Sequence, residues 1–168
     1  MQLRSAIKFA LPNCVLGFLA VGFIALPANA ATATSSFAVS VTVASTCLVS
    51  ATSLGFGSYS GLVAPASSTV SVTCTNTTPY NVGLSAGLGT GATVTARKMT
   101  GPSSALLAYG LFQDAGHTVG WGVTAGTDTV AGTGNGASQP ITVYGQIPTA
   151  QYVAPGAYAD TITVTVTY

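Results

Sequence analysis

Alternation of apolar and polar side chains is the strongest pattern in this chain. In its clearest stretch, TITVTVTY (161–168), threonines share one face and apolar side chains share the other: Ile162, Val164, Val166 and Tyr168. Successive side chains of a β-strand point to opposite faces, so a period of two predicts a strand with one buried face. Helical periodicity does not occur after the first thirty residues. The sequence therefore predicts an all-β fold.

Further alternating stretches are rich in Val, Thr, Tyr and Phe, which favour strands. With the one above, they cover residues 36–43, 68–74, 79–86, 92–99, 106–113, 140–147 and 161–168. Turn dipeptides such as Thr78-Pro79, Gly101-Pro102 and Asn135-Gly136 separate them. Short strands at roughly regular spacing predict a β-sandwich.

The first thirty residues predict a secretory signal. A positively charged start precedes an apolar run over residues 14–26 and a small-x-small site that ends at Ala30. The run of thirteen residues is too short to span a bilayer comfortably. We expect cleavage after Ala30, no membrane insertion of the mature chain, and three parts: a signal peptide (1–30), an N-terminal extension (31–46) and one domain (47–168).

Charge is scarce in the expected mature chain. Its basic residues are the pair Arg97-Lys98, which we expect in a solvated loop or at a strand edge, and its acidic residues are Asp114, Asp128 and Asp160. Nucleic acids and anionic lipids are bound by basic clusters, so neither is an expected partner. A surface of Thr, Ser, Gly and Asn suits a protein that lies packed beside copies of itself.

Two cysteines, Cys47 and Cys74, remain after the signal. An even number in an exported chain predicts a disulfide. Closing a loop of about 27 residues removes roughly 3.5 kcal/mol of unfolded-state entropy. Two thiols with the single distant histidine, His117, do not make a zinc site, so no metal is expected.

Catalytic patterns are weak. His117 follows Asp114 by three residues, but no G-x-S-x-G elbow accompanies them, and a polar turn is the better interpretation. The glycine-rich residues 132–136 lack the strand-to-helix step of a phosphate-binding loop. We expect no catalytic residue, no cofactor and no enzymatic activity. Trp121 and the tyrosines fit core or corner positions better than a sugar-binding platform, and a carbohydrate-binding module stays as a weaker alternative.

The expected mature chain carries an alternating stretch near each end. In the N-terminal one the apolar residues are Phe37, Val39, Val41 and Val43, and no further strand follows residues 161–168 in the sequence. A sandwich without its last strand has an open edge, which is a template for pairing with another chain. Two interpretations stay open on pattern alone. Residues 36–43 pair with 161–168 in the same subunit, or they pair with those of another subunit.

From Cys47 onward the chain resembles the spore coat protein U domain family, secreted β-domains that include the pilins of archaic chaperone–usher pili. The resemblance begins with CLVSATSLGFGSYSG (47–61). Its most specific motifs are LAYGLFQDA (107–115) with Trp121-Gly122 after it, VYGQIP (143–148) and YADTITVTVTY (158–168). Together, the matching stretches cover nearly all of the expected mature chain.

The resemblance implies an incomplete immunoglobulin-like sandwich that polymerises by donor-strand exchange. A periplasmic chaperone lends a strand to the groove, and an outer-membrane usher exchanges it for the N-terminal segment of the next subunit, an identical or related pilin. The donor residues are Phe37, Val39, Val41 and Val43. The acceptor groove is lined by Ile162, Val164, Val166 and Tyr168.

The resemblance also implies a location in an extracellular fibre or coat. A fibre subunit would serve surface attachment and biofilm formation, and the single-domain length favours a shaft or adaptor subunit. The alternative is a self-complete secreted coat protein that is a stable monomer.

Overall fold

The computed structural model describes residues 30–168, so the expected signal peptide lies outside the described residues except for Ala30. This part contains no α-helix, one turn of 3₁₀ helix (Pro102–Ser104) and no helix suited to crossing a membrane. Its eight strands are β1 (Cys47–Ala51), β2 (Ala64–Cys74), β3 (Pro79–Leu84), β4 (Arg97–Thr100), β5 (Leu106–Phe112), β6 (Val130–Thr133), β7 (Gln139–Ile147) and β8 (Val164–Thr167).

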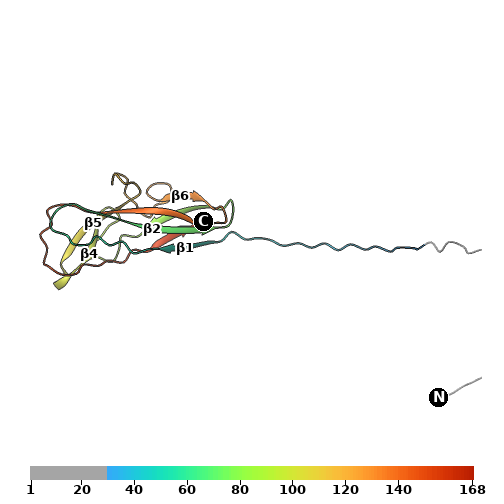
Figure 1. The fold of residues 1–168 in the computed structure, drawn as a ribbon, viewed down its shortest axis with the longest axis horizontal. Coiled ribbons are helices and arrows are strands. Elements are labelled where there is room, and N and C mark those ends of the chain that lie inside the picture. Colours follow the sequence, from blue (N-terminus) through green and yellow to red (C-terminus); the bar gives the residue numbers. More distant parts are fainter. Residues whose placement is uncertain (1–29) are drawn as a thin grey trace, which may run out of the picture. The chain divides into compact units, whose positions relative to one another are not determined.

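The strands form two sheets, and every ladder is antiparallel (Figure 1). One sheet has the order β1-β2-β7-β5-β4, and the other has the order β6-β3-β8. This all-β, immunoglobulin-like sandwich confirms the predicted fold class. β1 lies at an edge of the first sheet and β8 at an edge of the second.

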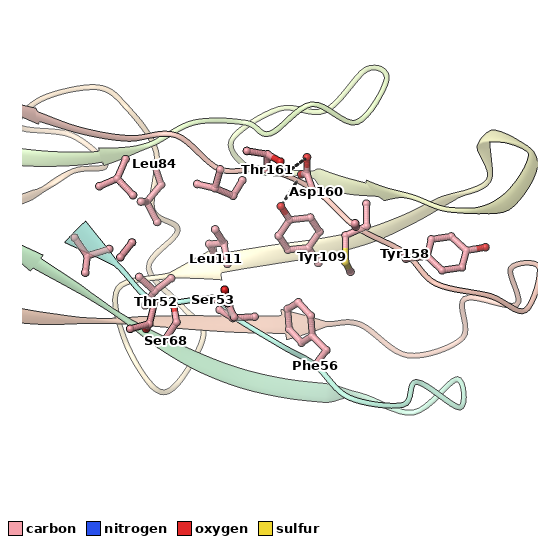
Figure 2. Close-up of a pocket in the computed structure, with 18 residues that line it drawn as sticks. Thr52, Ser53, Phe56, Ser68, Leu84, Tyr109, Leu111, Tyr158, Asp160 and Thr161 are labelled. Atoms are coloured by element: carbon pink, nitrogen blue, oxygen red, sulfur yellow. Dashed lines mark hydrogen bonds between the residues drawn. The ribbon is translucent and has the colours of Figure 1, made fainter. Parts of the chain in front are cut away.

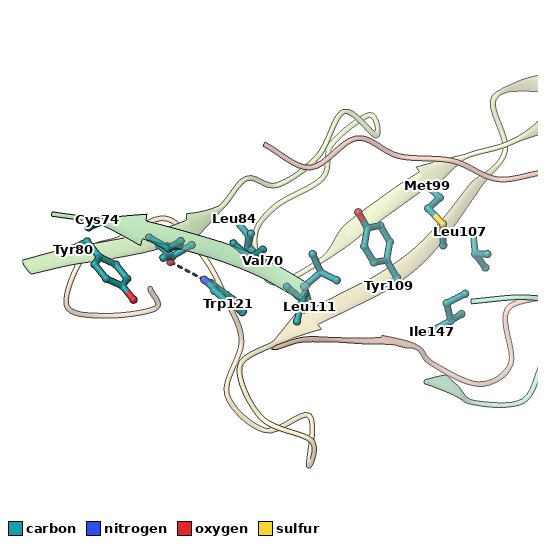
Figure 3. Close-up of a cluster of buried hydrophobic side chains, with 13 residues drawn as sticks. Val70, Cys74, Tyr80, Leu84, Met99, Leu107, Tyr109, Leu111, Trp121 and Ile147 are labelled. Atoms are coloured by element: carbon teal, nitrogen blue, oxygen red, sulfur yellow. Dashed lines mark hydrogen bonds between the residues drawn. The ribbon is translucent and has the colours of Figure 1, made fainter. Parts of the chain in front are cut away.

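The core fills the space between the two sheets. β5 and the last part of β2, from Val70 to Cys74, bury every second side chain, and β3 adds Tyr80, Val82 and Leu84. Trp121 is fully buried, and its indole Nε1 donates a 2.8 Å hydrogen bond to the carbonyl of Val82 (Figure 3). The fixed indole joins the segment after β5 to β3 of the opposite sheet.

Arg97 at the start of β4 is also fully buried, so the expectation of a solvated pair is wrong for this residue. Its guanidinium donates hydrogen bonds of 2.7–2.8 Å to four backbone carbonyls, those of Leu84, Ser85, Val94 and Trp121. Burial lowers the pKa of Arg97 from its ordinary value. The planar fork is satisfied by these four carbonyls, which is why a cation is stable here.

Several predicted strands differ from the observed ones. β2, β3, β5 and β7 fall on predicted stretches, whereas only the last part of 92–99 becomes strand, in β4. Residues 36–43 form no strand in the single chain, because a strand requires a neighbour to complete its backbone hydrogen bonds. β1 and β6 were not predicted. The final stretch is shorter than expected, since β8 begins at Val164.

The disulfide between Cys47 and Cys74 is confirmed. The two residues are direct partners in the β1–β2 ladder. The bond therefore ties the first residue of an edge strand to the last residue of an inner strand.

We predict that Arg97→Met lowers the free energy of unfolding by about 3 kcal/mol or more, because it leaves buried carbonyls without donors. Urea unfolding measures the change. The neighbouring half-buried Lys98 supplies a matched control, and K98M should change the value by about 0.5 kcal/mol or less. Equal effects of the two substitutions would contradict the role assigned to Arg97.

We predict that replacing both Cys47 and Cys74 by serine lowers the free energy of unfolding by roughly 3–4 kcal/mol, the chain-entropy value for a loop of this length. Thermal and urea unfolding of the oxidised chain and the double variant provide the comparison. An unchanged midpoint would show that the bond does not constrain the unfolded chain.

Candidate functional site

The candidate site is the space between the two edge strands. β1 pairs only with β2, and β8 only with β3, among the strands of residues 30–168. Beyond Ala51 the β1 side continues as residues 52–61, which join no strand, and residues 158–163 lead into β8. Two adjoining cavities lie between these segments.

The first cavity has a volume of about 440 Å³. One wall is formed by Ala51–Phe56 apart from Gly55, and the other by Tyr158–Val164 apart from Thr163. Core side chains form the floor, among them Val70, Leu84 and Leu111. Figure 2 shows Thr52, Ser53 and Phe56 across from Tyr158, Asp160 and Thr161, with Tyr109 and Leu111 between the two rows.

The second cavity has a volume of about 810 Å³ and lies between residues 54–61 and 151–158. Both cavities are lined by Leu54, Phe56, Met99 and Tyr158, so they form one continuous opening. We call it the groove. Its floor is apolar, and its walls are two chain segments with no backbone hydrogen bond between them in the described part of the chain.

The wall over residues 158–164 is attached on its other side. Ala159 exchanges two backbone hydrogen bonds with Thr100 of β4, and the Thr163 N–H donates to the Ser85 hydroxyl at 2.9 Å. These contacts hold the wall while leaving its groove-facing edge without a strand partner. Such an edge is the kind of surface to which an additional strand pairs.

Asp160 joins this wall to the groove floor. Its carboxylate accepts hydrogen bonds from the Tyr109 hydroxyl at 2.6 Å, the Leu88 N–H at 2.7 Å and the Thr161 N–H at 2.8 Å. Burial raises the pKa of the Tyr109 hydroxyl, and the hydrogen bond to Asp160 acts in the same direction. Tyr109 therefore stays a protonated donor at physiological pH, and this pair fixes the wall over β5.

Only two of the four predicted acceptor residues line the groove. Ile162 and Val164 line the first cavity, and Val166 is half-buried against the core beyond it. Tyr168 is 57% exposed and does not line the groove.

The predicted donor residues Phe37, Val39, Val41 and Val43 are 76–88% exposed. They belong to residues 30–46, which form no helix or strand.

The wall on the β1 side was missed by sequence reasoning. Leu54 and Phe56 supply its apolar side chains, and both pack against the core. They alternate with glycine in LGFG (54–57), so a period of two was present. Glycine in the intervening positions concealed it, because the alternation expected for a strand is between apolar and polar side chains.

The pair Asp114 and His117 does not form a catalytic relay. The Asp114 carboxylate accepts hydrogen bonds from the Thr118 N–H and hydroxyl and from the Val119 N–H, which lowers its pKa. The His117 ring packs edge-on against Phe112 with 5.3 Å between ring centroids. No group of three or more His, Cys, Asp or Glu residues suited to a metal occurs within residues 30–168.

Comparison with known proteins identifies a family and a full-length relative that this chain matches. The Spore Coat Protein U domain model matches residues 33–165. Protein U of Myxococcus xanthus is 32% identical over an alignment of 181 positions, which spans 98% of this chain and 99% of that protein.

A solved structure has a similar fold. It is the CsuC–CsuE chaperone–tip adhesion subunit pre-assembly complex from archaic chaperone–usher Csu pili of Acinetobacter baumannii. The TM-score is 0.57 at 23% identity over 76% of this chain, which spans 41% of the length of that solved chain. By the family match and the full-length relative, this chain belongs to the Spore Coat Protein U domain family.

Proposed function

We propose that the chain is a structural subunit of an extracellular fibre, in which the groove of one copy receives residues 37–43 of another. The observation that carries this proposal is the open, apolar-floored groove between two sheet edges, in a chain that also contains an exposed alternating apolar segment. An added strand would supply both the missing backbone partners and the missing core side chains.

The donor segment and the groove match in length. Seven residues from Phe37 to Val43 span about 20 Å as a strand, at roughly 3.3 Å per residue. The wall from Tyr158 to Val164 is also seven residues long. The groove continues past Tyr158 into the second cavity, so residues beyond the donor segment have space to follow.

The donor side chains also match the groove floor in chemistry. Phe37, Val39, Val41 and Val43 share one face of an extended segment, and burial of each contributes roughly 1.5–3 kcal/mol. The intervening Ala38, Ser40 and Thr42 would face away from the core. No charge would be buried, since residues 36–46 contain none.

An identical copy is the donor that best fits the fibre. Each subunit would use its groove for one neighbour and its extension for another, and this head-to-tail contact does not close on itself. In this scheme a periplasmic chaperone fills the groove before assembly and an outer-membrane usher exchanges the strand. The fold likeness to a subunit solved together with its chaperone supports this. Surface attachment and biofilm formation would be the roles of the assembled fibre.

A coat protein is the second candidate, favoured by the family to which the chain belongs. In that function the extension pairs within its own subunit, and the product is a monomer. Size and heat resistance of the purified full chain distinguish the two candidates.

We predict that Val41→Asp abolishes assembly of the full chain, because the substitution places an unpaired carboxylate against the groove floor. A cost of about 3 kcal/mol or more weakens the contact at least about 100-fold. Size-exclusion chromatography with light scattering, before and after heating, measures the multimers.

Thr42→Asp is the matched control for that experiment. It adds the same charge one residue away on the opposite face, so multimers should form as they do from the unmodified chain. Heat-resistant multimers of V41D would contradict the proposed contact. An unmodified chain that is a stable monomer and unfolds when V41D is introduced would support the coat protein instead.

A further inference from the structure

We propose that the end of the domain formed by loops 57–63 and 148–157 is a second contact surface between copies, and that it binds the end of the next copy that carries Cys47. We call the first surface the apolar end and define it by Leu62, Val63 and Tyr152. This inference rests on the proposed function, since it follows from how the donor strand would connect two domains.

The two loops lie at the same end of the sandwich. β2 begins at Ala64 opposite Ile147, the last residue of β7, so the loops that precede and follow these residues are neighbours. The Ala150 N–H donates a 2.8 Å hydrogen bond to the Gly61 carbonyl. The Tyr59 hydroxyl donates to the Pro148 carbonyl at 2.6 Å and accepts from the Gln151 N–H at 3.1 Å. These bonds hold the loops in one arrangement.

This fixed surface exposes large apolar side chains to solvent. Tyr152 is 90% exposed and Leu62 is 71% exposed. The surface borders the groove, because Tyr152 lines the second cavity. Exposed aromatic and aliphatic side chains that lie together on an ordered surface are typical of an interface core.

The short connection between donor and domain restricts where the next copy lies. Only three residues separate Val43 from Cys47, so their Cα atoms are at most about 14 Å apart. Cys47 is fixed to Cys74 by the disulfide. The Cys47 end of the donor copy must therefore lie within that distance of the point where Val43 leaves the groove.

The two ends of the groove are not equivalent exits. A subunit's own extension ends at its Cys47, the first residue of β1, and β1 contacts β8. The last residue of β1, Ala51, lines the first cavity, and the apolar end lies beyond the second, so Cys47 is at the opposite end of the groove. A donor leaving there would compete for space with that extension. The other exit runs past Tyr158 to the apolar end. The donor strand would then run antiparallel to β8, with Phe37 toward Val164 and Val43 toward Tyr158.

The two surfaces are chemically compatible. Loops 57–63 and 148–157 contain no charged residue, and neither do residues 44–51. Leu48 at the Cys47 end is 71% exposed. A contact between these ends would remove apolar side chains from water without removing any charge from water, which is the composition of a stable interface core.

The first test is chemical labelling of Tyr152 by iodination, followed by mass spectrometry. In multimers of the full chain, Tyr152 should react several-fold more slowly than in the unassembled V41D chain. If V41D does not fold, the unmodified chain held below its assembly concentration is the reference. The V123Y substitution adds a control position in a loop away from both ends, where Val123 is exposed, and its labelling should not change on assembly.

The second test uses the double substitution Leu62→Ser and Val63→Ser, with Val123→Ser as the matched control. Neither residue lines the groove, so multimers should still form, and their persistence length in electron micrographs should fall several-fold. Equal labelling of Tyr152 in both states, or unchanged stiffness of the double variant, would overturn this inference while leaving the groove contact in place. An unmodified chain that forms no multimers would overturn the proposed function, and this inference with it.

Discussion

An immunoglobulin-like sandwich with an unpaired edge on each side of its core is the constraint on which the other features depend. β1 and β8 approach each other from different sheets, and the groove between them lacks a strand. At this position the apolar floor, which the two sheets otherwise enclose, is open. The disulfide fixes the start of β1, which leads into one wall of the groove, and the Asp160–Tyr109 hydrogen bond fixes the other wall.

Hydrogen bonds of buried polar groups hold the segments of this open sandwich in one arrangement. Arg97 satisfies four carbonyls between β4 and the segments that follow β3 and β5, and Trp121 adds a bond to Val82. Arg97, Trp121 and Val82 do not line the groove. The single chain is thus stabilised by core contacts among its own strands, and the proposed donor strand would add contacts at the edge. A chain with so few charges uses one of them inside the protein.

Alternation along the sequence was sufficient to predict the inner strands, because β2, β5 and β7 each have one face on the core. Alternation failed to predict segments in which buried and exposed positions do not correspond to apolar and polar residues. The edge strand β1 buries only part of one residue, Cys47, and the groove wall alternates bulky residues with glycine. The burial of Arg97 was unpredictable because three of its four carbonyl partners, those of Leu84, Ser85 and Trp121, lie 12–24 residues away in the sequence.

The N-terminal extension illustrates a different limit. Its alternation predicts a strand, yet strand structure is a property of a pair, and residues 36–43 of the single chain remain without one. The alternation in residues 36–43 predicts which face of the segment would be buried. It does not predict whether that face is buried in the same copy or in another one. Family membership shows which proteins this chain is related to. Whether residues 36–43 pair within their own subunit or with another copy is decided by experiment.

The most direct measurement is solid-state NMR on multimers assembled from an equal mixture of two differently labelled copies. Methyl contacts are recorded between Val39 or Val41 of one label and Ile162 or Val164 of the other. The account predicts strong contacts between copies of different label. Contacts found only within copies of the same label would contradict it, because the extension would then complete its own sandwich.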